Sequence, residues 1–413
     1  LILGASGSGK TTYLYDQVIQ ASMKRPDRTY FIIVPEQFTM QAQKDIITRH
    51  PNHGTMNLDV VSFQRLAFRV FEELAVENLQ VLDDMGKSMV LRKVAANHRR
   101  DLVLFQGHLG QAGFVNQLKT TLSEFYQYGI TPQILQEMAP QARTPLFGQK
   151  LRDFAVVFQG FEDYIAGHYI TTEEVLDVLC RVLPRSGLVK NSIVALDGYA
   201  GFMPVQYRLV QMFLIYAKQV VVTVTADPRA PLYRKLGMQS LFHMSSQMVR
   251  RLTKLAEENQ VKKLPDRWLP ESGKIKGGIP PRFAGNPELA FLEQNLFRYG
   301  KNAYEGEMAG GVELYQAANP SREIAHVAHR IQGMVRQRGM RYRDMAIITG
   351  DLAGYGNEVA RQLEKNGIPF FMDDKKDVLD NPMVELIRGA LEAVQKDFSY
   401  ESVFRFLRTG LVV

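Results

Sequence analysis

A loop with phosphate-binding spacing lies at the start of the chain, between an apolar strand and a helical pattern. Residues 4–11 match G-x-x-x-x-G-K-[ST] in full. In such a loop the backbone N–H groups and the helix N-terminus surround a β-phosphate, Lys10 reaches the β and γ oxygens, and Thr11 holds Mg²⁺. The loop predicts a nucleotide site without defining the reaction, and its residues are Gly4, Ala5, Ser6, Gly7, Ser8, Gly9, Lys10, Thr11 and Thr12.

A carboxylate that could complete this site ends a second apolar run, residues 192–197. We expect Asp197 to contribute to Mg²⁺ binding together with the nucleotide. In an active motor the next residue is usually a glutamate that orients the attacking water, but this sequence has Gly198. Loss of that carboxylate should slow hydrolysis by roughly two to four decades. Nucleotide binding could survive, because Lys10, Thr11 and Asp197 are all present.

Polar and aromatic residues follow two further predicted strands. Gln37, Phe38 and Thr39 follow the strand at residues 30–34, at the end where open α/β sheets bind ligands. Ser62 and Phe63 lie at the next strand-to-helix turn, where a ring can stack on a base and a hydroxyl can contact a phosphate. The alternative for Phe63 is a hydrophobic staple at the helix start.

The elements that must position these groups follow from hydrophobic periodicity. Strands are predicted near residues 1–3, 30–34, 59–63, 192–197 and 219–225, and helical patterns dominate residues 85–185. Basic clusters at residues 92–93 and 98–100 are either a solvated face or a phosphate-contacting one. Residues 253–288, rich in Lys, Pro and Gly, are predicted to be a crossing linker. A second α/β unit begins near Val312, with strands at residues 312–315, 345–349 and 368–372.

Composition limits the class of protein. A chain of 413 residues predicts two or three domains, and its net charge of +7 favours a polyanionic partner. The single cysteine, Cys180, excludes a disulfide framework and suits a reducing cytoplasm. No window reaches the roughly 18 apolar residues of a membrane span, so we expect neither secretion nor membrane insertion. We also expect a few residues ahead of Leu1 and a continuation beyond Val413.

These motifs together resemble the first motor domain of superfamily 1 helicases of the UvrD/RecB type. Residues 34–39, "VPEQFT", resemble their second motif, and residues 61–69, "VSFQRLAFR", resemble the segment that meets single-stranded DNA. Residues 197–206 resemble the Asp-Glu box, with its Asp and its later Gln but without its Glu. Residues 292–295 resemble the motif whose arginine touches the γ-phosphate, but two residues intervene before Arg298, so we do not expect that role for it.

The departures from the motor pattern resemble one family, the AddB/RexB subunits of ATP-dependent helicase/nucleases, over nearly the whole chain. The resemblance implies an α/β fold: a P-loop (RecA-like) parallel sheet domain with an inserted, mainly helical subdomain and a second RecA-like α/β domain. The expected divisions are 1–84 with 186–252 for the first domain, 85–185 for the insertion, 253–288 for the linker and 289–413 for the second domain.

The same resemblance implies a role in double-strand-break repair and recombination, with ATP and Mg²⁺ as cofactors. Its implied partners are an AddA-type helicase/nuclease subunit and DNA, both double-strand ends and single strands, with recognition of a recombination hotspot sequence. The nuclease domain and the cysteines of an iron–sulfur cluster would lie beyond Val413, so no cluster is expected here. The implied DNA contacts are Gln37, Phe38, Thr39, Ser62, Phe63 and Arg65.

Two other functions remain compatible with the residues. In the first, the chain is an active superfamily 1 motor in which another carboxylate replaces the missing glutamate. In the second, it is a structural scaffold whose phosphate loop is vestigial. Gly198 distinguishes a weak ATPase from an active motor, and nucleotide affinity distinguishes either from a scaffold.

Overall fold

The computed structural model of the protein describes residues 1–413 except 77–79, 110, 167, 271–278, 299, 301, 308–309, 374–377, 379–380 and 413. Contacts within the chain divide it into two compact units, Leu1–Val312 and Glu313–Val413, and each is described by itself.

The first unit contains all the strands of the described residues. They are β1 (Ile2–Gly4), β2 (Thr29–Ile33), β3 (Leu58–Val61), β4 (Val81–Leu82), β5 (Ile170–Thr171), β6 (Ser192–Leu196), β7 (Gln219–Thr225) and β8 (Arg267–Leu269). Its helices are α1 (Lys10–Lys24), α2 (Thr39–Arg49), α3 (Phe63–Glu73), α4 (Asp84–Asn97), α5 (Ala112–Tyr128), α6 (Pro132–Met138), α7 (Pro145–Ile165), α8 (Glu174–Val182), α9 (Gly187–Lys190), α10 (Pro204–Tyr216), α11 (His243–Glu258) and α12 (Pro287–Asn295). Short 3₁₀ turns include η1 (Glu36–Phe38), η2 (Ala139–Gln141), η3 (Leu183–Arg185) and η5 (Pro281–Phe283).

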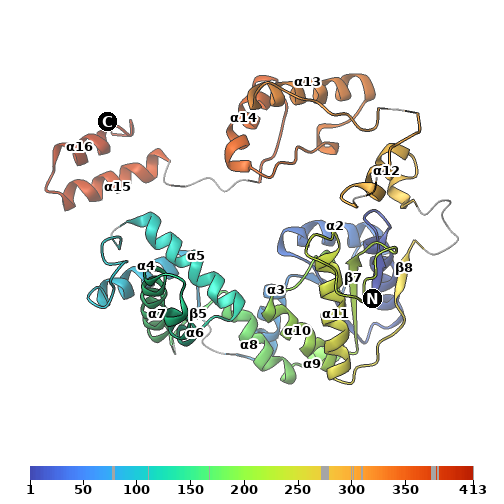
Figure 1. Ribbon diagram of the computed structural model, residues 1–413, viewed down its shortest axis with the longest axis horizontal. Coiled ribbons are helices and arrows are strands. Elements are labelled where there is room, and N and C mark those ends of the chain that lie inside the picture. The colour runs from blue at the N-terminus through green and yellow to red at the C-terminus, as the bar shows by residue number, and fades with distance from the viewer. Residues whose placement is uncertain are drawn as a thin grey trace. The chain divides into compact units, whose positions relative to one another are not determined.

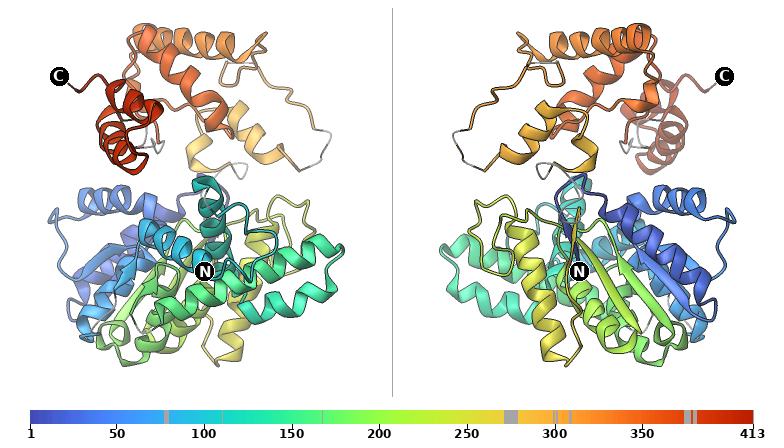
Figure 2. Two further views of the ribbon diagram at one scale, coloured as in Figure 1. Left: turned by 90° about the vertical axis from the view of Figure 1, so that its left-hand side faces the viewer. Right: turned by 90° about the vertical axis from the view of Figure 1, so that its right-hand side faces the viewer.

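A six-stranded sheet in the order β3-β2-β6-β7-β1-β8 is the framework of this unit. Every neighbouring pair in it is parallel, which confirms the predicted parallel α/β sheet. Parallel strands must be joined by crossover connections, and here these are helices on both faces of the sheet. The two views of Figure 2 show this layered arrangement.

The two faces of the sheet have separate hydrophobic cores, because side chains alternate along each strand. One core packs α1 and α2 against residues such as Tyr30 and Ile32. The other packs α3, α8, α10 and α11 against Phe31 and Ile33. Since both faces are covered, the strands are nearly continuous apolar runs, as parallel strands require.

Helices α4 to α7 form a group with its own hydrophobic core, drawn together in Figure 1. Phe154 and Phe158 of α7 pack there against Phe125 of α5, with ring centroids 5.5 and 6.0 Å apart. The group leaves and rejoins the rest of the unit at β4 and β5, which pair with each other in parallel. Helix α8, also within the stretch 85–185, packs instead on the core of the main sheet.

The stretch predicted as a linker, residues 253–288, contains regular structure. Its first residues complete α11, and Arg267–Leu269 form β8, which pairs with β1 at the edge of the sheet. Hydrophobic periodicity does not reveal β8, because three residues ahead of a proline are too few to show a strand pattern.

The second unit contains α13 (Pro320–Arg338), η6 (Tyr342–Asp344), α14 (Leu352–Lys365), α15 (Pro382–Gln395) and α16 (Tyr400–Leu407). Helices α13 and α14 share a small core that includes Ile324 and Val359. The strands predicted at 312–315, 345–349 and 368–372 are not formed within the described residues. A β-strand requires a hydrogen-bonded neighbour, and these segments have none there.

In the described part of the chain, no helix combines the length and the apolar character needed to cross a membrane.

A buried carboxylate in the helical group provides a test of its stability. Asp153 is 1% exposed and accepts hydrogen bonds from the backbone N–H groups of Val103, Leu104 and Phe105. We expect Asp153→Ala to lower the free energy of unfolding by about 3 kcal/mol, because it leaves these groups without their acceptor. Urea unfolding followed by circular dichroism measures the change. The control Asp163→Ala, at an exposed site, should stay within about 0.5 kcal/mol, and equal effects would contradict the assignment.

Candidate nucleotide site

The phosphate loop connects β1 to α1 and has the conformation that phosphate binding needs. Gly9, at the helix N-cap, has φ of 88°, which side chains disfavour, and a Cβ placed there would meet no atom within 4 Å. The Tyr13 N–H donates to the carbonyl of Gly9 over 2.9 Å, so the helix begins directly behind the loop. The loop therefore presents open backbone at Gly9, directly before the N-terminus of α1.

Lys10 lies folded over the loop, with its Nζ donating to the carbonyls of Gly4 and Ala5 at 3.0 and 2.9 Å. Burial lowers the pKa of its ammonium to about 8, against the opposing attraction of Asp197, and nearby Arg282 lowers it further. A lysine with a lowered pKa beside a phosphate loop is charged at neutral pH but loses its charge within an accessible pH range.

Asp197 follows β6 and is only 5% exposed. Its Oδ1 accepts hydrogen bonds from the hydroxyls of Thr11, at 3.3 Å, and Thr223, at 2.5 Å. Its backbone N–H donates to the carbonyl of Ile33 in β2. The two residues predicted to serve the metal, Thr11 and Asp197, are thus in contact although they are far apart in sequence.

Gly198, at the position of the missing glutamate, has φ of +80°. A Cβ there would lie 3.6 Å from Pro35 Cδ, an ordinary contact, so space does not exclude a side chain. The backbone conformation disfavours a side chain, because the left-handed region costs roughly 1–2 kcal/mol for a residue other than glycine. A side chain at position 198 is therefore disfavoured by the backbone conformation and not by a clash.

The residues present fit a magnesium-bound nucleotide. Ser8 Oγ is buried and has no hydrogen-bond partner among the described residues, so it is available to a ligand inside the loop. The Thr11 hydroxyl and the Asp197 carboxylate are the oxygen donors that Mg²⁺ prefers. Lys10 supplies a positive charge next to them.

A second group of charges stands beside the loop. The N–H of Arg282, in η5, approaches the carbonyl of Gly7 at 3.4 Å. Farther along the chain, Arg298 donates to Asp227 at 2.9 Å and lies 3.5 Å from the Glu293 carboxylate. Burial raises the pKa of Asp227, but hydrogen bonds from Arg229 and Arg298 outweigh it and hold the pKa at about 2. Arg298 is thus engaged in ion pairs with Asp227 and Glu293.

The residues predicted to contact DNA fall into two groups. Gln37, Phe38 and Arg65 are exposed, with Phe38 49% accessible. They follow β2 and β3, which are adjacent and parallel, and therefore lie toward the same edge of the sheet as the phosphate loop.

Thr39, Ser62 and Phe63 are buried and have structural partners. Thr39 donates to the carbonyl of Glu36, and Ser62 caps α3 by accepting from the N–H of Arg65. Phe63 is 4% exposed and packs against the ring of Tyr199, with centroids 5.5 Å apart. In this structure its ring is a buried packing contact between α3 and the segment that follows β6.

Two residues of the site were not predicted. Thr223 lies inside the regular apolar strand β7, where a lone threonine is an ordinary strand residue, so the sequence held no signal for its contact with Asp197. Arg282 lies in the stretch predicted as a linker, and only the fold brings it to Gly7.

Comparison with known proteins agrees with this geometry. Residues 1–293 match the family model described as ADDB, N-terminal. The chain is 41% identical over 411 residues to the B-type subunit of the ATP-dependent helicase/deoxyribonuclease of Lachnoclostridium phytofermentans, covering 99% of this chain and 35% of that protein. It is 35% identical to the corresponding helicase/deoxyribonuclease protein of Moorella thermoacetica, covering 100% of this chain and 36% of that protein. The chain spans about a third of the length of these relatives. It belongs to the AddB family, and the region that it matches is the N-terminal one.

Proposed function

We propose that the chain is the nucleotide-binding and DNA-binding N-terminal region of the AddB-type component of an ATP-dependent helicase/exonuclease that processes double-strand breaks. The observation that carries the proposal is the contact of Thr11 with Asp197 next to Lys10, combined with the left-handed backbone at Gly198. The first feature supports binding of Mg²⁺ and ATP. The second disfavours any side chain at position 198, where a glutamate would orient water for hydrolysis.

Each residue has a definite part in binding. The N–H groups of the loop and the Lys10 ammonium neutralise the β and γ phosphate oxygens, and Thr11 and Asp197 hold the metal. Bound Mg²⁺ supplies charge neutralisation at the phosphates. Since Gly198 has no side chain, Lys10, Thr11 and Asp197 stabilise the bound nucleotide without activating water. The site acts as a sensor or a clamp, with little turnover.

DNA binding is supported by the exposed residues at the carboxyl edge of the sheet and by the net charge of +7. Phe38 can stack on a base, and Arg65 and Gln37 can contact phosphates.

The further proposals rest on the family: an AddA-type partner subunit, a cytoplasmic location, recognition of a hotspot sequence, and the divisions 1–84 with 186–252, 85–185, 253–288 and 289–413. A nuclease domain would lie outside these residues.

A second candidate, an active motor, is favoured by one observation. The Glu293 carboxylate interacts electrostatically with Lys10 and raises its pKa, so a carboxylate other than that at position 198 is near the phosphate loop. The Glu293 carboxylate lies 3.5 Å from the Arg298 guanidinium, and this ion pair opposes the use of Glu293 as a general base. Turnover that disappears in Glu293→Gln would support this candidate.

The scaffold with a vestigial loop would show no nucleotide affinity at all.

Removal of the lysine should weaken nucleotide binding. We expect Lys10→Ala to raise the dissociation constant for ATP by roughly 10- to 100-fold, the effect of a charge-assisted hydrogen bond. In the wild type, affinity should be constant below pH 8 and should fall above it, because Lys10 has a pKa of about 8 and binding requires its charged form. Calorimetric titration from pH 7 to 9.5 measures both. The control Lys24→Ala, at the far end of α1, should match the wild type, and an unchanged constant in Lys10→Ala would refute the site.

Restoring the glutamate should not restore a motor. We expect Gly198→Glu to raise DNA-stimulated ATP turnover by less than about tenfold, well short of the two to four decades attributed to such a carboxylate. It should also lower the free energy of unfolding by roughly 1–2 kcal/mol, because φ at this position is positive. Gly198→Ala carries the same strain without the carboxylate and is the matched control. An increase of about 100-fold in the Glu variant alone would show that the backbone does not limit catalysis.

DNA binding should depend on salt and on the exposed edge residues. We expect Arg65→Ala to reduce the slope of log affinity against log salt by about 1. Phe38→Ala should weaken single-stranded DNA binding by about 1–3 kcal/mol, the usual loss of one stacked base. Fluorescence anisotropy with a labelled oligonucleotide measures both. Phe68→Ala, also 49% exposed but one turn along α3 from Arg65, is the control, and equal losses in the two Phe variants would argue against a specific contact.

A further inference from the structure

A short turn ahead of α12 lies directly against the phosphate loop. The backbone N–H of Arg282, in η5, approaches the carbonyl of Gly7 at 3.4 Å. A Cβ placed at Gly7 would lie 2.8 Å from the Cβ and 3.3 Å from the Cδ of Arg282, closer than side chains normally pack. It would also lie 3.4 Å from the ring of Phe283. The stem of Arg282 can therefore lie on the loop because Gly7 has no side chain.

The turn holds Arg282 in place before any ligand binds. Two consecutive prolines directly precede Arg282, and a proline ring fixes φ. The N–H of Phe283 donates to the carbonyl of Pro280 over 2.9 Å. Asn286 then caps α12 by accepting from the N–H of Leu289 at 2.9 Å. Because the backbone is already ordered, a ligand that binds Arg282 does not have to order this segment.

The guanidinium of Arg282 is exposed and has no acidic partner. Within the part of the chain that the structure describes, its side chain makes no hydrogen bond or ion pair. The other arginines of this region differ, because Arg229 and Arg298 both form ion pairs with Asp227. A guanidinium presents a rigid fork of N–H donors that matches phosphate geometry. The charge of Arg282 is therefore available to an anion at the loop.

Lys10 indicates which part of a nucleotide Arg282 can reach. Burial is the main cause of the lowered pKa of Lys10, and repulsion from the Arg282 charge lowers this pKa further, so the two cations act on the same space. The N–H groups of a phosphate loop enclose the β-phosphate, and its lysine reaches the β and γ oxygens. The group that lies outside the loop on the side of the lysine is thus the γ-phosphate.

From these contacts we infer that Arg282 binds the γ-phosphate and is the residue by which this site distinguishes ATP from ADP. Its planar guanidinium can donate two parallel hydrogen bonds to two oxygens of one phosphate. The inference rests on the proposed nucleotide site, and it adds recognition of the third phosphate to that site. In a site with little turnover, such recognition makes the triphosphate, and not the product of hydrolysis, the ligand that stays bound.

Calorimetric titration of the wild type and of Arg282→Gln with Mg²⁺-ATP and Mg²⁺-ADP tests this role. The substitution should raise the dissociation constant for ATP by roughly 10- to 100-fold, the effect of charge-assisted hydrogen bonds. The constant for ADP should change by no more than about twofold, as for a surface substitution. Unchanged ADP binding also shows that the loop of the variant is intact. The control Arg250→Gln, at an exposed position of α11, should match the wild type for both nucleotides.

The outcomes separate this inference from the proposed function. Equal losses for ATP and ADP, or no loss for either, would overturn the role of Arg282 and leave the nucleotide site in place. A wild type that binds neither nucleotide would refute the site itself, and the role of Arg282 with it. Arg282→Lys keeps the charge but not the planar fork, so its affinity for ATP should lie between those of the wild type and Arg282→Gln.

Beryllium fluoride gives a second readout of the same contact. Together with ADP it occupies the position of the third phosphate, so it should strengthen ADP binding by the wild type. In Arg282→Gln this gain should be lost, because the guanidinium that stabilises the added anion is absent. An equal gain in the two proteins would contradict a contact between Arg282 and the γ position.

Discussion

The buried carboxylate of Asp197 is the contact on which the arrangement of the first unit depends. The carboxylate joins the hydroxyl of Thr11 in α1 to that of Thr223 in β7. The backbone N–H of Asp197 donates to the carbonyl of Ile33 in β2. A carboxylate that is 5% exposed is tolerated only where hydrogen bonds replace water. Two hydroxyl donors, Thr11 and Thr223, satisfy the carboxylate, and the Thr11 contact also joins the start of α1 to the carboxyl edge of the sheet. The packing of the first unit and the proposed nucleotide site therefore share a single group.

The parallel sheet determines which residues can take part in a common site. Because all six strands are parallel, the segments after β1, β2, β3 and β6 emerge at one edge, and Lys10, Phe38, Arg65 and Asp197 all follow from there. The residues that turn inward at that edge, such as Phe63 against Tyr199, maintain the shape of the edge. Neighbours at the same turns thus differ: the buried ones support the fold, and the exposed ones are those proposed to contact DNA.

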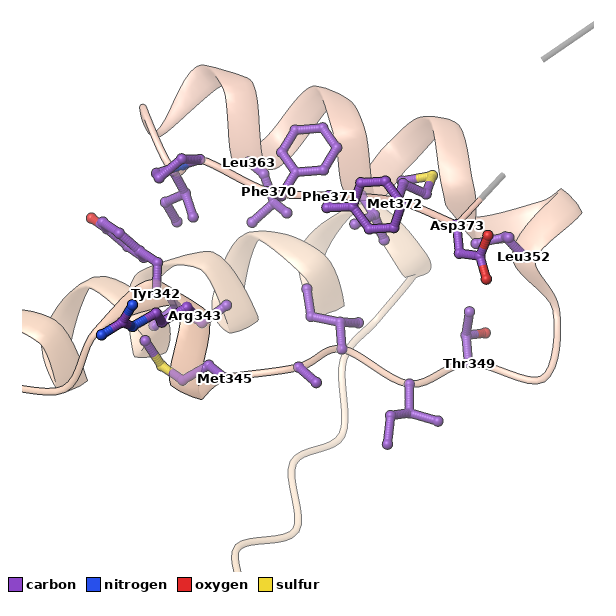
Figure 3. A pocket seen from close by; sticks show the side chains of 17 residues that line it. Tyr342, Arg343, Met345, Thr349, Leu352, Leu363, Phe370, Phe371, Met372 and Asp373 are labelled. Atoms are coloured by element: carbon purple, nitrogen blue, oxygen red, sulfur yellow. The ribbon is translucent and has the colours of Figure 1, made fainter. Parts of the chain in front are cut away.

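Much of the first unit could be predicted from the sequence, because its signals are local. The phosphate loop is defined by spacing, and β2, β6 and β7 are continuous apolar runs. Features that depend on partners far along the chain could not be predicted. The burial of Phe63 requires Tyr199, the role of Thr223 requires Asp197, and Arg282 reaches Gly7 only in the fold. The strands predicted at residues 345–349 and 368–372 are not formed within the described residues (Figure 3), because a strand forms only when a neighbour pairs with it.

The position of β1 in the sheet has a consequence for how the protein is made. Leu3 pairs only with Val224 and Trp268 among the described residues, so β1 leaves the ribosome about 220 residues before the nearer of its two partners. At bacterial elongation rates this is roughly 10 to 45 seconds. During that time an apolar segment joined to a glycine-rich loop has no sheet to enter. Translation speed is thus one of the conditions under which this sheet is completed.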